Sequence, residues 1–151
     1  MTHVRNESDI NADLEQRLCK ACGFCCDGTL FVNVRIREEE PVDTYKKVGL
    51  QIAESTEGLV TMKQPCASFK DQCCQTYQCR PLRCGEFKCK LLKQTGQGTM
   101  TETEAMSIIE DCLELRFQYT QLLWTIFPQF KKKAIASTFR EIRKASRRLS
   151  G

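Results

Sequence analysis

The sequence predicts an α+β protein that is mainly helical, with one small β-hairpin in a cysteine-rich core and C-terminal helices after it. Three observations lead to this prediction. Eleven of the 151 residues are cysteine, and ten of these lie before residue 95. Two short runs of alternating apolar residues flank an acidic segment, which is typical of strands. After residue 99, apolar residues recur every three or four positions, which is typical of helices.

The elements expected before residue 95 are short. A helix is predicted over residues 7–18, because apolar residues recur there at helical spacing up to the first cysteine. Residues 31–36 alternate, with Val32, Val34 and Ile36 on one side, and predict a strand. Residues 58–63 predict a second short strand. Residues 38–54 begin acidic and then carry apolar residues four apart, which predicts a second short helix.

Antiparallel pairing of the two strands would have a consequence for the cysteines. In such a pair, the start of one strand lies beside the end of the other. Cys26 precedes the first strand and Cys66 follows the second. We therefore expect these two cysteines to be neighbours, although 40 residues of sequence separate them.

Two longer helices are expected after the core. Thr101 and Glu104 form one of two overlapping capping boxes that start a helix running to about residue 127, and Pro128 ends it. One face of this helix carries Ile108, Cys112, Leu115, Tyr119, Leu122 and Ile126. Ile109, Leu113, Phe117 and Trp124 widen this face. We expect so much apolar surface to pack against the rest of the protein. A last helix over residues 129–149 has a narrow apolar stripe of Ile135, Phe139, Ile142 and Leu149.

Length and composition bound the organisation. At 151 residues we expect one domain overall, with a core over residues 1–95 and a helical segment over 99–151 packed on it. No apolar run approaches the roughly 18 residues that span a bilayer. The polar N-terminus has no signal-peptide character, so a cytoplasmic location is expected.

The cysteines indicate metal ligation. Disulfide frameworks suit short secreted chains with an even number of cysteines, whereas this chain has eleven and no export signal. His3 is the single histidine, which excludes Cys2His2 fingers and Cys–His nucleophile pairs. The ligands would then be thiolates, which select zinc or an iron–sulfur cluster. The predicted core would therefore be metal-stapled, that is, held together by the metal that its cysteines bind.

The cysteines fall into two clusters. The first is Cys19-x2-Cys22-x2-Cys25-Cys26, a close spacing of the kind that brings several thiolates to one iron–sulfur cluster. The second comprises Cys66, Cys73, Cys74, Cys79, Cys84 and Cys89. Basic residues near both clusters, Arg80 above all, could offset the negative charge of the thiolates.

The two clusters together resemble the CxxCxxCC (YkgJ-type) family of zinc- or iron-chelating proteins. The resemblance runs from Cys19-Lys-Ala-Cys22-Gly23-Phe-Cys25-Cys26 through Pro65-Cys66 to Cys74-x2-Tyr77-x2-Arg80-Pro81-x2-Cys84. It implies metal ligands among Cys19, Cys22, Cys25, Cys26, Cys66, Cys74 and Cys84. Four cysteines depart from the pattern: Cys73, Cys79, Cys89 and Cys112. We expect Cys112, on the apolar helix face, to be a small core residue.

The C-terminal segment from Pro128 is strongly basic. It has eight Lys or Arg and one acid, a charge of +7 within a chain of +4. Such a segment could contact an unidentified protein partner, or it could be a solvated helix face. It lacks the interleaved aromatic residues that stack on bases, which disfavours nucleic acid.

These observations favour a metal-binding protein over other classes. The centre is expected to be an iron–sulfur cluster, for example 4Fe–4S, with a role in electron transfer, metal or cluster handling, or partner binding. A structural zinc module is the first alternative. A cluster-dependent enzyme or enzyme subunit is another, although no catalytic constellation is visible beyond the cysteines. A redox switch with a vicinal disulfide at Cys25–Cys26 or Cys73–Cys74 is the third.

Overall fold

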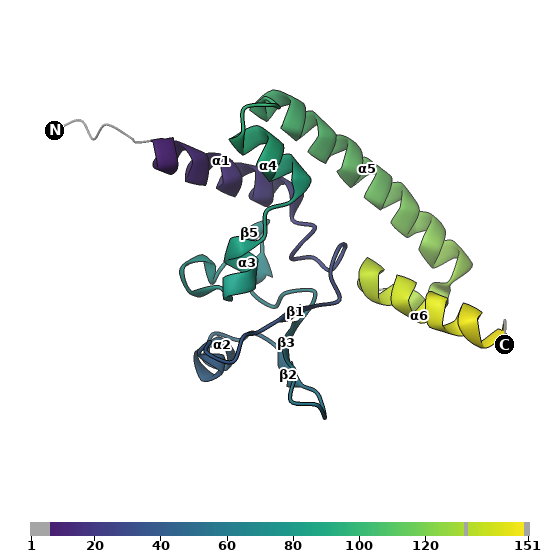
Figure 1. Ribbon diagram of the computed structural model, residues 1–151. Coiled ribbons are helices and arrows are strands. Elements are labelled where there is room, and N and C mark those ends of the chain that lie inside the picture. Colours follow the sequence, from purple (N-terminus) through teal and green to yellow (C-terminus); the bar gives the residue numbers. More distant parts are fainter. Residues whose placement is uncertain (1–6, 132, 150–151) are drawn as a thin grey trace. The chain divides into compact units, whose positions relative to one another are not determined.

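The computed structural model describes residues 7–131 and 133–149, so His3 and Lys132 lie outside it. Its helices are α1 (Glu7–Cys22), α2 (Val42–Lys47), α3 (Leu82–Glu86), α4 (Lys90–Gly96), α5 (Glu102–Ile126) and α6 (Ile135–Leu149) (Figure 1). Its strands are β1 (Asn33–Arg35), β2 (Ile52–Glu54), β3 (Val60–Lys63), β4 (Phe69–Lys70) and β5 (Cys73–Cys74). This confirms an α+β protein. No described helix has the length and apolar character needed to span a bilayer.

The chain divides into two compact units, each built from two segments of sequence. Unit 1 comprises Met1–Gly23 and Lys88–Tyr119, and unit 2 comprises Phe24–Phe87 and Thr120–Gly151. The core of unit 1 is a cluster of Leu18, Leu92, Ala105 and Ile109, which come from α1, α4 and α5. The predicted division into residues 1–95 and 99–151 is a different partition and stays a prediction.

The N-terminal helix is longer than expected and includes the first two cysteines. The helix ends at Cys22, and Gly23 follows it. The Gly23 N–H donates to the Cys19 carbonyl oxygen at 2.9 Å, and the φ of Gly23 is +68°. Glycine adopts this left-handed conformation without the strain of a side chain, and it is the usual residue just past a helix end. Cys19 and Cys22 are three residues apart in the last turn and therefore lie on one face of α1.

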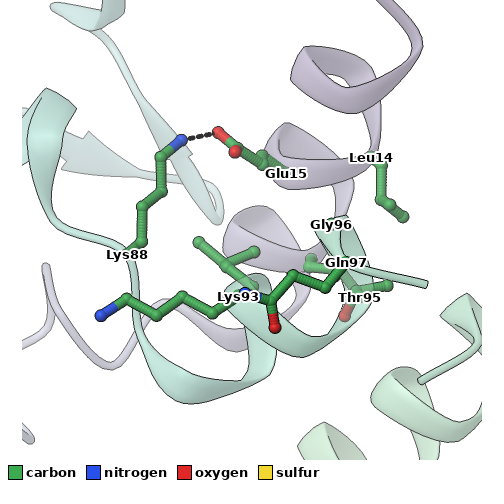
Figure 2. Close-up of a pocket in the computed structure, with 9 residues that line it drawn as sticks. Leu14, Glu15, Lys88, Lys93, Thr95, Gly96 and Gln97 are labelled. Carbon is green, nitrogen blue, oxygen red and sulfur yellow. Dashed lines mark hydrogen bonds and ion pairs between the residues drawn. The ribbon is translucent and has the colours of Figure 1, made fainter. Parts of the chain in front are cut away.

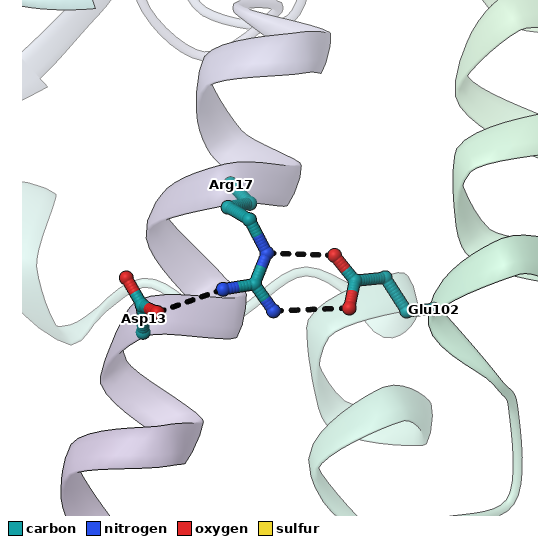
Figure 3. Close-up of polar contacts among 3 residues, drawn as sticks. All are labelled: Asp13, Arg17 and Glu102. Carbon is teal, nitrogen blue, oxygen red and sulfur yellow. Dashed lines mark hydrogen bonds and ion pairs between the residues drawn. The ribbon is translucent and has the colours of Figure 1, made fainter.

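An ion-pair network joins α1 to the start of α5 within unit 1. The Arg17 guanidinium donates to both carboxylate oxygens of Glu102, at 2.7 and 3.0 Å, and to Asp13 at 2.8 Å (Figure 3). The bidentate geometry holds the pKa of Glu102 below its ordinary value. All three side chains are solvent-exposed, so water and salt screen the attraction strongly.

The capping box at the start of α5 is confirmed. The Thr101 Oγ1 accepts from the Glu104 N–H at 3.2 Å, and a Glu104 carboxylate oxygen accepts from the Thr101 N–H at 2.8 Å. These reciprocal bonds satisfy donors that the helix itself leaves unpaired. The helix ends at Ile126, two residues before Pro128, as expected from the proline.

The predicted strand pair is also confirmed, and the sheet has a third strand. β1 pairs antiparallel with β3, with Asn33 opposite Lys63, and β2 pairs with the other edge of β3. A helix was predicted over residues 38–54, but the observed helix α2 ends at Lys47, so the prediction was wrong for the residues after it. Gly49 has φ +86° and ends the helical conformation, and the chain continues into β2. The four-residue spacing of Val48 and Ile52 therefore does not reflect a helix.

The sheet supplies most of the core of unit 2. This core contains Ile36, Tyr45, Leu50, Met62 and Cys66, all buried. Met62 lies on β3, the central strand, and is only 1% exposed. The alternation read from the sequence is thus correct in phase, because Val34 and Ile36 contact this core while Arg35 is exposed.

The predicted packing of α5 is correct only in part. Ile109 is buried and Leu113 packs against the unit 1 core, and Ala105 and Leu123 are buried as well. The other side of the predicted apolar surface is exposed: Ile108, Leu115, Phe117, Leu122 and Ile126. Cys112 is half-buried and is absent from the residues that contact the unit 1 core. Apolar side chains occur on several sides of this helix, so periodicity alone could not tell which stripe is buried.

The start of α6 is tied to the segment that follows Cys26. The Ala136 N–H donates to the Gly28 carbonyl oxygen at 3.0 Å, and a Cβ at Gly28 would come within 2.6 Å of the Ala134 Cβ. Only glycine fits there. The apolar stripe predicted for α6 is correct in part: Ile135 and Ile142 are half-buried, but Phe139 is 51% exposed. The side chain of Leu149 is outside the described residues.

Candidate metal centre

The β1–β3 pairing brings Cys26, the last cysteine of the first cluster, to Cys66 of the second cluster within unit 2. Beyond the strands, the Gln64 N–H donates to the Val32 carbonyl oxygen at 3.1 Å. The Cys66 N–H then donates to the Cys26 carbonyl oxygen at 2.7 Å. Cys26 and Cys66 are therefore direct backbone neighbours, as the sequence predicted. Their side chains contribute to the same apolar cluster.

A two-stranded hairpin adds a third cysteine. β4 and β5 pair with Lys70 opposite Cys73 and Phe69 opposite Cys74. The turn residues Asp71 and Gln72 have φ of +51° and +56°, the left-handed values of a type I′ turn. Successive strand residues point to opposite sides. This alternation separates the two adjacent thiols, and Cys74 is the one whose charge acts on Cys26 and Cys66.

Cys84 completes the group from the short helix α3. It packs against the core cluster that contains Cys66. Burial raises the pKa of the Cys84 thiol to about 12, and the charges of Cys66 and Cys74 contribute to the rise. Burial likewise raises the pKa of Cys26, with further contributions from Cys66, Cys74 and Cys84. Four cysteines from four separate segments thus interact electrostatically.

Backbone donors favour the thiolate form at one member of this group. Burial raises the pKa of Cys66 above its ordinary value, and the backbone N–H groups of Ser68 and Phe69 offset part of that rise. N–H groups beside a sulfur stabilise its charged form, which is the form that ligates metals. A second polar contact is at Cys74, whose sulfur lies 3.6 Å from the Thr76 hydroxyl oxygen.

Arg80 is the positive charge that acts on Cys84. Its guanidinium carbon lies 4.0 Å from the centre of the Tyr77 ring, a stacked cation–π geometry that fixes the side chain. A Cβ at Gly85 would lie 3.4 Å from the Arg80 Nε, which places the guanidinium over α3. Arg80 also lowers the pKa of Cys84, against the stronger effect of burial. It is therefore held where it offsets negative charge at the thiols.

Glu40 is a supporting residue that the sequence did not reveal. Its carboxylate is buried and accepts hydrogen bonds from the Arg37 N–H at 2.8 Å and the Leu82 N–H at 2.7 Å. The Tyr45 hydroxyl donates a third at 2.9 Å. Burial alone would raise the pKa of Glu40, but these bonds outweigh it and hold the pKa below its ordinary value. Glu40 thereby attaches the first turn of α3, which carries Cys84, to the rest of unit 2.

The other predicted ligands lie elsewhere in the two units. Cys25 belongs to unit 2 and contributes to the raised pKa of Cys26. Cys19 and Cys22 belong to unit 1, where Cys22 contacts the apolar core together with Cys89. Their ligand role stays a prediction.

No disulfide joins any of the eleven cysteines. Within residues 7–131 and 133–149, no set of three or more Cys, His, Asp or Glu side chains is already arranged to hold a metal ion. The four thiols are grouped by their electrostatic interaction and, for Cys26, Cys66 and Cys84, by a shared core cluster.

A small pocket in unit 1 is unrelated to these thiols. It has a volume of about 280 Å³, below the roughly 300–1,000 Å³ typical of small-molecule sites. α1 and α4 line it, and the ion pair between Glu15 and Lys88 lies at its edge (Figure 2). No cysteine lines it. We assign it no ligand.

Comparison with known proteins adds no relative to this picture. The resemblance to the CxxCxxCC family therefore depends on the cysteine motifs, with Tyr77, Arg80 and Pro81. No protein-family model matches the chain, and no curated protein or solved structure matches it.

Proposed function

We propose that this chain is a metal-binding protein of the CxxCxxCC type, whose centre is held by cysteine thiolates. The observation that supports the proposal most is the convergence of Cys26, Cys66, Cys74 and Cys84 in unit 2. Four thiolates are the ligand set of structural zinc and of common iron–sulfur clusters. Cys19, Cys22 and Cys25 are the further ligands that the family motif implies.

The chemistry of the four thiols supports a bound cation. In a metal-free chain, burial and repulsion between thiolates favour the protonated form of Cys26, Cys66 and Cys84, whose pKa values are raised. A bound metal replaces those protons and removes the repulsion. Arg80 and the N–H groups at Cys66 then hold the excess negative charge.

An iron–sulfur cluster is our first choice of centre, and zinc is the alternative. The surplus of cysteines and the single histidine support the cluster. A cluster would supply electron transfer or take part in metal handling. Zinc would make the chain a structural module, because zinc has no redox chemistry. The exposed basic side chains of α6, Arg140, Arg143, Lys144 and Arg147, are the surface we propose for a protein partner.

Thiol alkylation with and without a chelator tests the proposal. We expect Cys26, Cys66, Cys74 and Cys84 to resist maleimide in the protein as purified and to react after metal removal. Cys79 is exposed and should react in both conditions, which makes it the internal control. Equal labelling of the four cysteines before and after chelation would contradict a metal centre. Labelling that requires a reductant instead of a chelator would favour a disulfide switch.

Arg80 gives a prediction about charge at the centre. Arg80→Gln keeps a polar side chain but removes the charge that acts on Cys84, so we expect about tenfold weaker metal retention. Competition against a chromogenic chelator measures this. Arg83 is an exposed arginine on α3, and Arg83→Gln is the matched control that should retain metal like the parent. Equal losses in both variants would mean that general charge, not Arg80, matters.

A further inference from the structure

The start of α6 packs directly on the segment that follows Cys26, within unit 2. Gly28 is the contact residue of that segment, because a Cβ there would lie only 2.6 Å from the Ala134 Cβ. The Gly28 carbonyl oxygen also accepts a hydrogen bond from the Ala136 N–H at 3.0 Å, in the first turn of α6. Thr138 in the same turn is completely buried. Close packing and a backbone hydrogen bond thus attach α6 to the segment of Cys26.

The same glycine contacts the segment that leads to Cys66. A Cβ at Gly28 would lie 3.4 Å from both the Cγ and the nitrogen of Pro65. Pro65 immediately precedes Cys66, whose N–H donates to the Cys26 carbonyl oxygen at 2.7 Å. Gly28 therefore links three parts of unit 2: the segment of Cys26, the segment of Cys66 and the start of α6.

The body of α6 is less firmly packed than its first turn. The core cluster of unit 2 includes no described side chain of α6. Ile135 and Ile142, which share a helix face with Thr138, are only half-buried. α6 has 15 residues, a length at which a helix without tertiary packing is marginal in water. We therefore expect docking of α6 to depend on the contacts at Gly28.

We propose that metal binding at Cys26 and Cys66 is coupled to the docking of α6 through Gly28. This inference rests on the proposed metal centre and gives that centre a regulatory role. A metal held by both thiolates would cross-link the two segments that Gly28 contacts, and would thereby fix the surface on which α6 docks. The metal-loaded protein would hold the basic surface of α6 on unit 2, and the metal-free protein would release it more often. Because such coupling is reciprocal, a partner bound to docked α6 would strengthen metal retention.

Hydrogen exchange of the parent protein, loaded with metal and after chelation, tests the coupling. We expect the amides of residues 136–144 to exchange about tenfold faster after metal removal, because α6 then undocks and frays. The amides of residues 105–113 on α5, in unit 1, are the internal reference and should keep their rates. A parent that binds metal but whose α6 amides exchange equally in both states would overturn the coupling and leave the proposed centre intact. A parent that binds no metal would instead overturn the proposed function.

Two variants test the reciprocal effect of α6 on the metal. Gly28→Ala would place a methyl group 2.6 Å from the Ala134 Cβ, and it also strains a backbone whose φ is +80°. We expect this variant to speed exchange in α6 and to weaken metal retention about tenfold, measured by competition against a chromogenic chelator. Adding Ala134→Gly removes the methyl group that clashes, so the double variant should recover most of the lost retention.

Gly58→Ala is the matched control for backbone strain. Gly58 also belongs to unit 2 and has φ +74°, but a Cβ there would have no neighbour within 4 Å. This variant should retain metal and protect its α6 amides like the parent. A double variant no better than Gly28→Ala, or an equal loss in Gly58→Ala, would show that strain rather than the contact with α6 sets metal retention. Either result would overturn the proposal.

Discussion

Cys84→Ser is expected to lower metal content and stability together. In the parent, removal of metal should lower the free energy of unfolding by several kcal/mol. A metal that binds the folded chain but not the unfolded chain stabilises the folded state. The variant lacks one of the four converging thiols and should bind metal poorly. A chelator should therefore change its unfolding midpoint little. Denaturant titrations of both proteins, with and without chelator, measure the difference.

Cys112→Ser is the matched control for this experiment. Cys112 is half-buried on α5 and belongs to unit 1, whereas the four thiols belong to unit 2. The Cys112→Ser variant should keep its metal, and the chelator should lower its free energy of unfolding as much as that of the parent. If Cys112→Ser lost metal as Cys84→Ser does, the four-cysteine assignment would be wrong. The same comparison for Cys22→Ser would show whether unit 1 contributes a ligand.

Glu40→Gln should destabilise unit 2 without removing a thiol. Its carboxylate accepts bonds from two backbone N–H groups and from the Tyr45 hydroxyl, and it is 6% exposed. Bonds to a buried charge are stronger than neutral ones, so we expect a loss of about 2–3 kcal/mol in the free energy of unfolding. Glu39 is an exposed neighbour, and Glu39→Gln should cost less than about 0.5 kcal/mol. Urea unfolding at neutral pH measures both.

The effect of Glu40 should depend on pH with a definite sign. Its pKa in the folded chain is lowered from the ordinary 4.5, so its contribution to stability is complete above that value. The contribution is lost as the pH falls through the lowered folded pKa. The difference in stability between the parent and Glu40→Gln should therefore be constant above about pH 4.5 and narrow in more acidic solution. A difference that grew in acid would contradict the assignment of a charged Glu40.

The sequence was most informative where a local pattern has one structural solution. The alternation in residues 31–36 predicted β1, the short apolar run in residues 58–63 predicted β3, and their pairing predicted the contact between Cys26 and Cys66. Thr101 and Glu104 predicted the start of α5, because the capping box depends on side chains only three residues apart. These features needed no knowledge of distant packing.

Other features depend on tertiary context and were missed. β2 forms because it pairs with β3, although its segment was expected to be helical. The buried stripe of α5 could not be chosen, since apolar residues occur on several sides. Glu40 follows two exposed glutamates, Glu38 and Glu39, and nothing local distinguishes it. Its role arises from Leu82, which lies 42 residues away in sequence.

The cysteines illustrate both cases. Their spacing predicted a shared metal site, which stays a prediction, and the structure places Cys26, Cys66 and Cys84 at one core cluster of unit 2. The family resemblance favoured Cys74 over the adjacent Cys73, and the β4–β5 register directs the two side chains to opposite sides. Thiolate ligands alone do not distinguish zinc from an iron–sulfur cluster, because each is held by four cysteines.

The central claim is a thiolate-held metal centre, and one measurement tests it most directly. The protein is purified without oxygen, its visible spectrum is recorded, and iron, zinc and sulfide are counted per chain. We predict a brown protein with iron and sulfide in stoichiometric amounts. A colourless protein with stoichiometric zinc would keep the thiolate site and replace the cluster by a structural metal. A protein that contains neither iron nor zinc would contradict the central claim.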